Sequence, residues 1–148
     1  MTAIDEEHIR ANFGVIWPAH VETFTWFLIQ CRRHFHGDLD LLLVLGVIGD
    51  RTLARGKAPP DLDYSQFIDK SWQPVEPEPL NARSLAEFTG IPRETARRKV
   101  QDLVDMGWVD RDERGYLTAS RKAAEELSPL TETTFQYLAR MASILAKP

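Results

Sequence analysis

The chain has 148 residues, of which 43% are hydrophobic and 27% are charged, and its formal net charge is −4 at pH 7. This length predicts one domain, or a small domain joined to an oligomerisation element. The acidic balance excludes a protein that binds nucleic acids non-specifically through its overall charge, because such binding grows with the number of phosphates that basic side chains neutralise.

Cysteine content and hydropathy indicate the compartment. The single cysteine, Cys31, leaves no intrachain disulfide, which suits a reducing cytoplasm. The longest apolar run, Leu41 to Gly49, is far shorter than the ~20 residues of a membrane helix. The acidic N-terminal segment lacks the apolar core of a signal peptide. We therefore expect a cytoplasmic protein that does not associate with membranes.

The first predicted helix begins at Pro18 and ends at Gly37. Proline is tolerated in the first turn of a helix, because backbone amides there have no hydrogen-bond acceptor within the helix. Its apolar side chains form a stripe that is wide enough to need two packing partners. The members are Val21, Phe24, Phe27, Leu28, Cys31 and Phe35, with Trp26 and Ile29 widening the stripe.

The second predicted helix follows at once, with Asp38 as its N-cap. Apolar residues occupy almost every position up to Asp50, so we expect this helix at the centre of the fold. Gly46 and Gly49 within it indicate a close approach of another helix backbone, with fraying as the alternative.

Residues 57–79 hold five of the nine prolines. This segment is therefore predicted to be a connection, with one or two helical turns between Tyr64 and Ser71. Leu80, at its end, is placed to add a short third strand to a hairpin farther along the chain.

A short helix is predicted after Asn81, which can cap it. The inward face of this helix holds Leu85 together with Phe88 or Ala86. Gly90 supplies the tight turn that lets the chain reverse.

Another helix begins at Pro92. Ala96, Val100 and Leu103 recur at three- and four-residue steps and should face the preceding helix, with the small Ala96 at the closest approach. The outward positions hold Arg93, Glu94, Arg97, Arg98 and Gln101.

A short β-hairpin is predicted next. Gly107 ends the helix, residues 108–111 alternate like a half-buried strand, and residues 115–117 form the return strand. Arg114 at the tip can reach phosphate or the minor groove, although the acidic residues beside it oppose that contact. Thr118 is predicted to cap the helix that follows.

Two more helices are predicted, from Ala119 to Leu127 and from Ser128 onward. One domain of this size cannot cover all the apolar stripes of its helices. We therefore expect a homodimer whose interface is built by the terminal helix and the two long N-terminal helices. The stripe of the last helix comprises Leu130, Thr134, Tyr137 or Leu138, Met141 and Leu145.

The stretch from Leu85 to Val109, LAEFTGIPRETARRKVQDLVDMGWV, resembles the winged-helix domains of MarR-like and GntR-like bacterial transcription regulators. The similarity covers roughly residues 80 to 120. It implies a homodimer that binds a pseudo-palindromic operator in double-stranded DNA, with the second helix in the major groove and the wing on the flanking backbone. The short hairpin tip departs from the longer, arginine-rich wing of MarR-like proteins.

The predicted elements and the resemblance together give a mainly α fold with a small β-wing. A winged helix-turn-helix is flanked by N- and C-terminal dimerisation helices. The chain then divides into an N-terminal helical dimerisation segment (1–56), the Pro-rich connection (57–79), the winged helix-turn-helix DNA-binding domain (80–118) and C-terminal helices that complete the dimer interface (119–148).

The predicted DNA contacts are concentrated on the second helix of the motif. Its four cations, which include Lys99, oppose Glu94 and leave a net charge of +3 on about two turns. Arginine can pair bidentately with guanine, whereas the alternative is an ordinary solvated helix face. The candidate DNA-binding residues are Arg93, Glu94, Thr95, Arg97, Arg98, Gln101 and Arg114.

No catalytic constellation is recognised, so we expect no enzyme activity, cofactor or metal site; Cys31, His34 and His36 match no standard zinc spacing. The sequence predicts a sequence-specific transcription regulator. The alternative is a winged-helix module for protein association, without specific DNA binding. Four aromatic residues offer either a cleft for a small-molecule effector or an ordinary core: Trp17, Phe24, Trp26 and Phe27.

Overall fold

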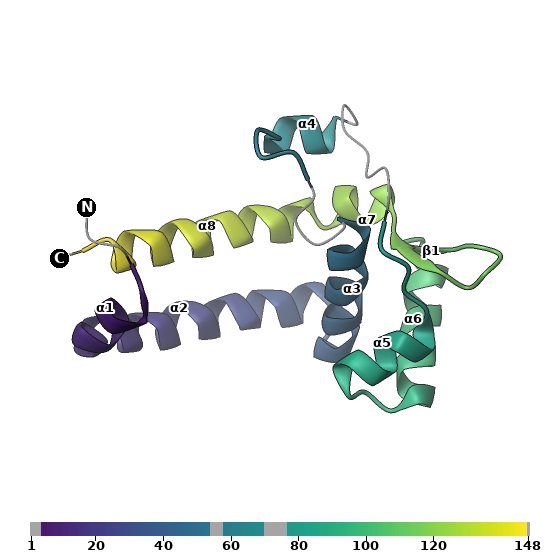
Figure 1. Ribbon diagram of the computed structural model, residues 1–148, viewed down its shortest axis with the longest axis horizontal. Coiled ribbons are helices and arrows are strands. Elements are labelled where there is room, and N and C mark those ends of the chain that lie inside the picture. The colour runs from purple at the N-terminus through teal and green to yellow at the C-terminus, as the bar shows by residue number, and fades with distance from the viewer. Residues whose placement is uncertain (1–3, 54–57, 70–76, 148) are drawn as a thin grey trace. The chain divides into compact units, whose positions relative to one another are not determined.

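The computed structural model describes residues 4–53, 58–69 and 77–147. Of these residues, 69% lie in helices, and a small two-stranded antiparallel sheet accompanies them (Figure 1). No helix among the described residues is both long enough and apolar enough to cross a bilayer. The elements are α1 (Glu6–Ala11), α2 (Phe13–His34), α3 (Leu39–Thr52), α4 (Tyr64–Ile68), α5 (Ala82–Thr89), α6 (Arg93–Asp105), β1 (Val109–Arg111), β2 (Leu117–Ala119), α7 (Arg121–Glu126) and α8 (Ser128–Leu145).

The chain forms two compact units. The terminal unit combines Met1–Gly37 with Ser128–Pro148, and the central unit is Asp38–Leu127. Helix α3 therefore belongs with α5, α6 and the hairpin, a grouping that the sequence division at residue 56 does not anticipate.

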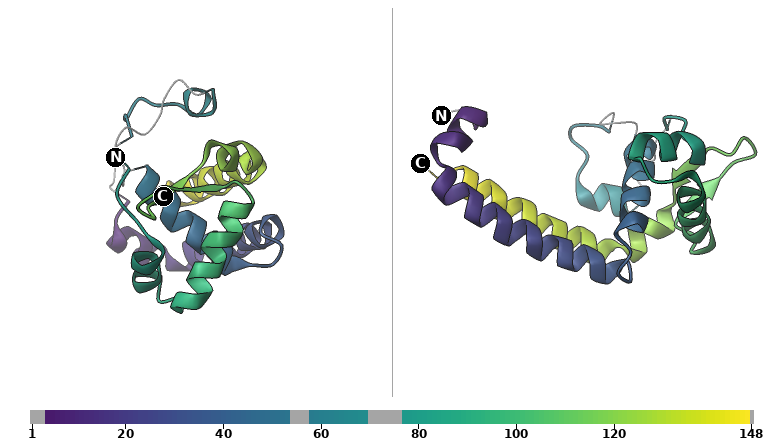
Figure 2. Two further views of the ribbon diagram at one scale, coloured as in Figure 1. Left: turned by 90° about the vertical axis from the view of Figure 1, so that its right-hand side faces the viewer. Right: turned by 90° about the horizontal axis from the view of Figure 1, so that it is seen from below.

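In the terminal unit, α2 and α8 lie side by side and run in opposite directions, as Figure 2 shows. The ring of Phe27 stacks on that of Tyr137 with 4.7 Å between centroids. At the far end of the pair, Nε2 of His8 in α1 lies 3.1 Å from the carbonyl oxygen of Leu145. The two long helices thus share one seam, closed at one end by α1.

The predicted helix start at Pro18 is wrong, because α2 begins five residues earlier and contains this proline. A proline inside a helix removes the backbone hydrogen bond to the residue four positions before it, here Gly14. Only one bond is lost, and burial of Ile16, which is 5% exposed, stabilises the turn ahead of the proline.

The central unit is built around α3, which contacts α5, α6 and β2. Asp38 caps this helix as predicted, since its Oδ1 accepts the Leu41 amide at 2.9 Å. The predicted close approach at Gly46 and Gly49 is wrong, because a Cβ at either position would have no neighbour within 4 Å among the described residues. The completely buried side chains around α3 are Val44, Ile48, Leu85, Ala96, Val100 and Leu103.

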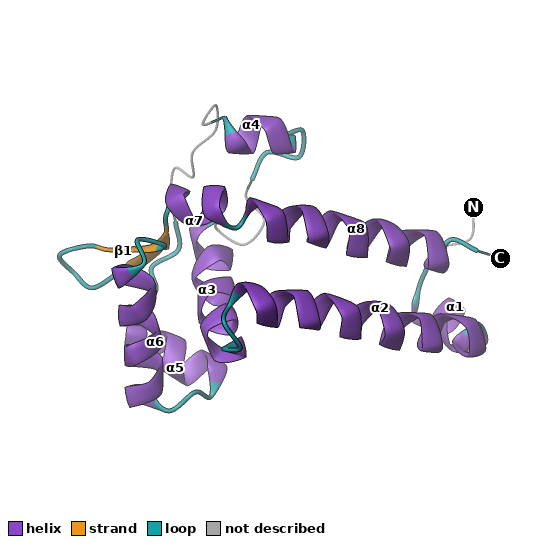
Figure 3. Cartoon of the chain, turned by 180° about the vertical axis from the view of Figure 1, so that it is seen from behind, coloured by secondary structure: helices purple, strands orange, loops and turns teal. Residues whose placement is uncertain are grey.

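Helices α5 and α6 follow the predicted pattern closely (Figure 3). Asn81 caps α5 by accepting the Ser84 amide at 2.9 Å, and Gly90 ends the helix in the left-handed region at φ 75°. Of the two alternatives for the inward face, Ala86 is buried. Phe88 is 63% exposed and lies 5.0 Å beneath the guanidinium of Arg51.

The hairpin pairs β1 with β2, with Val109 opposite Ala119. Thr118 does not cap the next helix, because it lies within β2; Ser120 caps α7 instead, with its Oγ accepting the Ala123 amide at 3.2 Å. The predicted third strand at Leu80 is reduced to one backbone bond, in which the Leu117 amide donates to the Leu80 carbonyl at 2.8 Å.

A second contact fixes β2 to α3. The buried Thr52 hydroxyl donates to the Ile48 carbonyl at 2.8 Å, and its oxygen accepts the Ala119 amide at 2.8 Å. In the predicted connection, α4 occupies part of the segment expected to be helical, while residues 70 and 71 lie outside the described part. Asp63 and Gln66 form a capping box at its start.

Candidate nucleic-acid interface

The outward face of α6 is determined by the core on its other side. Ala96, Val100 and Leu103 are completely buried, so the positions on the opposite side of the helix must face away from the central unit. Arg93, Glu94, Arg97 and Arg98 are exposed, whereas Thr95 and Gln101 are half-buried. Six of the seven predicted contact residues therefore lie on α6, and Arg114 lies in the hairpin loop.

Two of the arginines lie beside α5. Arg93 and Arg97 line a hollow of about 190 Å³ together with Ala82 and Arg83 from the first turn of α5. Arg83 was not among the predicted contacts. The sequence gives little indication that Arg83 belongs to this surface, because the hollow exists only where α5 and α6 pack together.

These guanidinium groups already pair with carboxylates of the chain. Glu87 Oε1 accepts from Arg83 Nε at 3.1 Å and lies 3.7 Å from Arg93 Nη2. Glu94 takes both a 3.1 Å bond from Arg97 Nε and a 2.6 Å bond from Arg97 Nη2. Any anion that binds to this face must compete with these two side chains.

The pair between Arg97 and Glu94 is bidentate but open to solvent. The hydrogen bond from Arg97 lowers the pKa of Glu94, and the same bond raises the pKa of Arg97. Both side chains are more than 60% exposed, so water and salt screen their attraction. The pair is therefore exchangeable for a stronger anionic partner.

Arg98 belongs to a different part of the same surface. It shares a helix face with Gln101, whose Oε1 accepts from both Nη atoms of Arg111 at 3.3 Å. Gln101 also donates to Asp105 at 2.8 Å. Among the described residues, no ion pair or side-chain hydrogen bond engages Arg98.

Lys99 does not add to the outward charge, contrary to the estimate of +3 from the sequence. Its Nζ pairs with Asp38 Oδ2, and the two side chains are only 19% and 29% exposed. Burial alone would raise the pKa of Asp38, but the hydrogen bonds from Lys99 and the Leu41 amide outweigh burial, and the pKa is lowered. This pair ties α6 to the start of α3.

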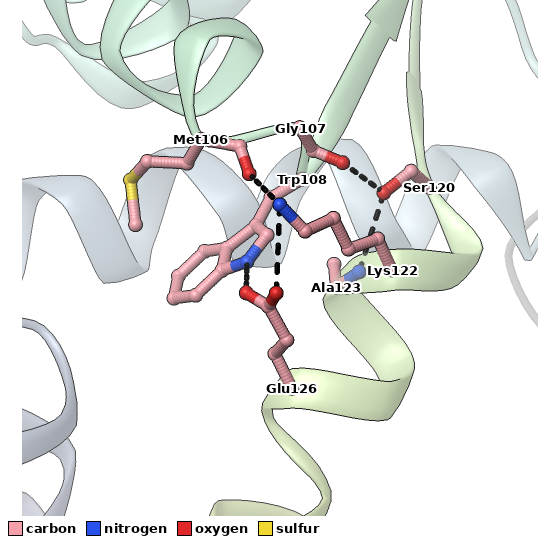
Figure 4. A network of polar contacts seen from close by, with 7 residues as sticks. All are labelled: Met106, Gly107, Trp108, Ser120, Lys122, Ala123 and Glu126. Carbon is pink, nitrogen blue, oxygen red and sulfur yellow. Dashed lines mark hydrogen bonds and ion pairs between the residues drawn. The ribbon is translucent and has the colours of Figure 1, made fainter.

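A polar network holds the base of the hairpin against α6 and α7 (Figure 4). Trp108 Nε1 donates to Glu126 at 2.6 Å, and this bond lowers the pKa of that carboxyl group. Lys122 donates to the Met106 carbonyl at 3.0 Å, and Ser120 donates to the Gly107 carbonyl at 2.6 Å. The hairpin is thereby fixed to the C-terminal end of α6.

At the tip of the hairpin, Asp112 orders the loop. Its Oδ1 accepts the backbone amides of Arg114 and Tyr116, each at 2.9 Å. The Arg114 side chain has no ion pair in the part of the chain that the structure describes. Asp110 and Glu113 are exposed nearby and reduce the positive potential at this point.

Of the four aromatic residues predicted to form an effector cleft, Trp17 and Phe24 are linked through His20 in a run of ring contacts along α2. Trp17 and Phe24 are 50% and 38% exposed. Trp26 lines a separate hollow of about 390 Å³ in the terminal unit with Tyr137 and four polar residues, Glu22, Thr23, Gln136 and Arg140. Within the described ranges, no three of the metal-ligating residue types come together.

No family model, no curated protein and no solved structure matches the chain. The interpretation of the α6 surface therefore depends on its own geometry and charge.

Proposed function

We propose that the chain is a sequence-specific, double-stranded DNA-binding transcription regulator that acts as a cytoplasmic homodimer. In this proposal, α5, α6 and the hairpin form a winged helix-turn-helix, and α6 enters the major groove. The observation that carries the proposal is the arginine-bearing outward face of α6, supported from behind by a completely buried core.

The dimensions of α6 suit this role. Its 13 residues span about 20 Å, and a helix fits into the major groove, which is about 12 Å wide. Arg98 is available for a bidentate pair with guanine, a contact that contributes about 1–3 kcal/mol of base discrimination. The neutral balance of residues 81–118, with seven basic and seven acidic side chains, favours base readout over general attraction to phosphates.

The homodimer is supported by the surface of the terminal unit. Exposed apolar side chains are common singly, but a continuous group indicates an interaction surface. The rings of Phe13, Trp17, His20 and Phe24 follow one another along α2 in such a group. A twofold dimer would place two copies of α6 about 34 Å apart, one turn of DNA. The exposed large apolar residues of this unit include Ile4, Ile9, Phe13, Val15, Trp17, Val21, Phe24, Trp26, Ile29, Phe135 and Leu138.

Selection of binding sites from random duplex DNA tests the proposal. The winning site and a scrambled control would then be titrated by fluorescence anisotropy at two salt concentrations. We expect an inverted repeat that binds much more tightly than the control. Arg98→Ala should lose that discrimination, whereas Arg10→Ala, an equal change of charge in the terminal unit, should retain it. No enrichment with folded protein would refute the proposal.

A protein-association module is the second candidate function. The observation that favours it is that the arginines next to α5 already bind carboxylates, Glu87 and Glu94. An acidic protein segment could replace these two side chains. Binding to duplex DNA would then be weak and independent of sequence, and the Arg98→Ala variant would not differ from Arg10→Ala.

A further inference from the structure

We infer that Arg83, Arg93 and Arg97 form a pocket that holds one phosphate of the DNA backbone, separate from the base-reading surface around Arg98. This inference rests on the proposed DNA-binding function and assigns a role to Arg83. The pocket divides the arginines of the motif between two tasks, positioning on the backbone and readout of sequence.

The first argument is convergence. Arg83 comes from the first turn of α5, and Arg93 and Arg97 come from successive turns of α6. Together with the small Ala82, the three side chains line an open and mostly apolar hollow of about 190 Å³. The guanidinium groups of Arg83 and Arg93 meet at Glu87 Oε1, at 3.1 Å and 3.7 Å. A tetrahedral phosphate offers several acceptor oxygens, so guanidinium groups arriving from different directions can each find a lone pair.

The second argument is charge. Three guanidinium groups face two carboxylates, because Glu87 is shared between Arg83 and Arg93 while Glu94 serves Arg97. The pocket therefore carries an excess of positive charge before any ligand binds. The first turn of α5 adds the positive end of a helix dipole, which also favours an anion.

The third argument is the low strength of the existing contacts. The side chains of Arg83, Arg93 and Arg97 are 73%, 67% and 63% exposed. Solvent-exposed ion pairs of this kind contribute little to stability, because water and salt screen them. A phosphate can displace Glu87 and Glu94 at little cost, and release of counterions from the DNA favours the exchange.

Helical geometry separates the pocket from Arg98. Arg93 and Arg97 are four residues apart and share a face, whereas Arg98 is rotated by about 100° from Arg97. Gln101, which lies between Arg97 and Arg98 around the helix, does not line the hollow, and neither does its partner Arg111. Loss of a pocket arginine should therefore weaken binding equally on all sequences, while loss of Arg98 should change the preference for sequence.

The test compares Arg83→Ala with Arg10→Ala. Both arginines are exposed and pair with a glutamate four residues away, at 3.1 Å and 2.5 Å, but Arg10 lies in the terminal unit. Affinity for several duplexes of different sequence would be measured between about 50 and 200 mM salt, a range over which binding through phosphate contacts weakens steeply. Thermal unfolding would verify that both variants fold, and Arg83→Lys would test whether a single positive charge is sufficient.

For Arg83→Ala we expect the slope of log K against log salt to become less steep by at most about 0.9, because Arg93 and Arg97 still face the phosphate, with an equal loss of affinity on every duplex. Arg83→Lys should restore most of the slope, and Arg10→Ala should match the wild type. An unchanged slope in Arg83→Ala, or a changed sequence preference, would overturn the pocket and leave the DNA-binding proposal intact. Wild-type protein that binds no duplex would overturn both.

Discussion

The central and terminal units solve the problem of burying apolar side chains in different ways. In the central unit, α3 lies among α5, α6 and β2, and six core side chains from α3, α5 and α6 are completely buried. In the terminal unit, α2 has 22 residues but buries only Ile16, Thr23 and Cys31. Packing two helices against each other covers one face of each helix and leaves its other faces in solvent. The terminal unit can therefore bury its remaining apolar side chains only against a further surface.

The largest expected effect is in the central core. Leu103→Ala removes a completely buried side chain and should lower the free energy of unfolding by about 2–5 kcal/mol, because a cavity remains. Leu138→Ala, at a position 54% exposed in the terminal unit, is the matched control and should change the free energy of unfolding much less at low protein concentration. Urea titration of both variants measures the difference. Equal losses would contradict the contrast between the units.

The second prediction concerns association. Trp17→Glu places a charge in the middle of the exposed aromatic stripe formed by Phe13, Trp17, His20 and Phe24. The dissociation constant of the homodimer should rise at least about tenfold, or ~1.4 kcal/mol, because a buried unpaired charge destabilises an apolar interface.

Sedimentation velocity over a range of concentrations measures this change. Phe88→Glu, at a position 63% exposed in the central unit, should leave the dimer intact. A wild-type protein that remains monomeric at all concentrations, or a dimer that survives Trp17→Glu, would show that the exposed stripe is not the dimer surface.

The third prediction uses the contact between Asp38 and Lys99. Because the pKa of Asp38 is lowered in the folded state, its contribution is complete above the unfolded pKa and is lost as the pH falls through the folded pKa. Asp38→Ala should cost about 1 kcal/mol at neutral pH by removing the N-cap of α3.

Asp38→Asn retains a capping oxygen but not the charge, so it should flatten the decline of stability below about pH 5. Asp40→Asn, at an exposed position in the same turn, serves as the control. Acid unfolding followed by circular dichroism measures all three variants. An Asp38→Asn curve parallel to that of the wild type would contradict the assigned role.

The smallest expected effect is on the charged surface of the central unit. Glu94→Gln should release Arg97 and raise the affinity for duplex DNA about two- to fivefold, the factor that corresponds to a weak surface ion pair. Glu6→Gln, which releases Arg10 in the terminal unit, should have no such effect. Anisotropy titration distinguishes the two. A lower affinity for Glu94→Gln would mean that Glu94 itself contacts a base.

Local chemistry explains which parts of the fold could be predicted. Asp38, Asn81, Gly90 and Gly107 act as expected because capping and left-handed turns depend on a few neighbouring residues. The position of Pro18 could not be read in the same way. A proline in the first turn and one in the second turn look alike until the packing of Ile16 is known.

The same limit applies to the candidate site. Helical periodicity places Arg93, Arg97 and Arg98 on the outside of α6, but it does not show that Lys99 turns inward to an aspartate 61 positions earlier. Nor does it connect Arg83 with the arginines of α6. Both relations depend on how helices pack, which no short sequence window contains.

The two contacts made by β2 on the side away from β1 have a consequence for aggregation. Strand edges with free amides can recruit strands of other chains. In this hairpin, the amides of Leu117 and Ala119 are taken by the Leu80 carbonyl and the Thr52 hydroxyl. Thr52→Val would keep the shape of the side chain yet free the Ala119 amide. The β2 edge of the wild-type hairpin is thus closed to extension by foreign strands.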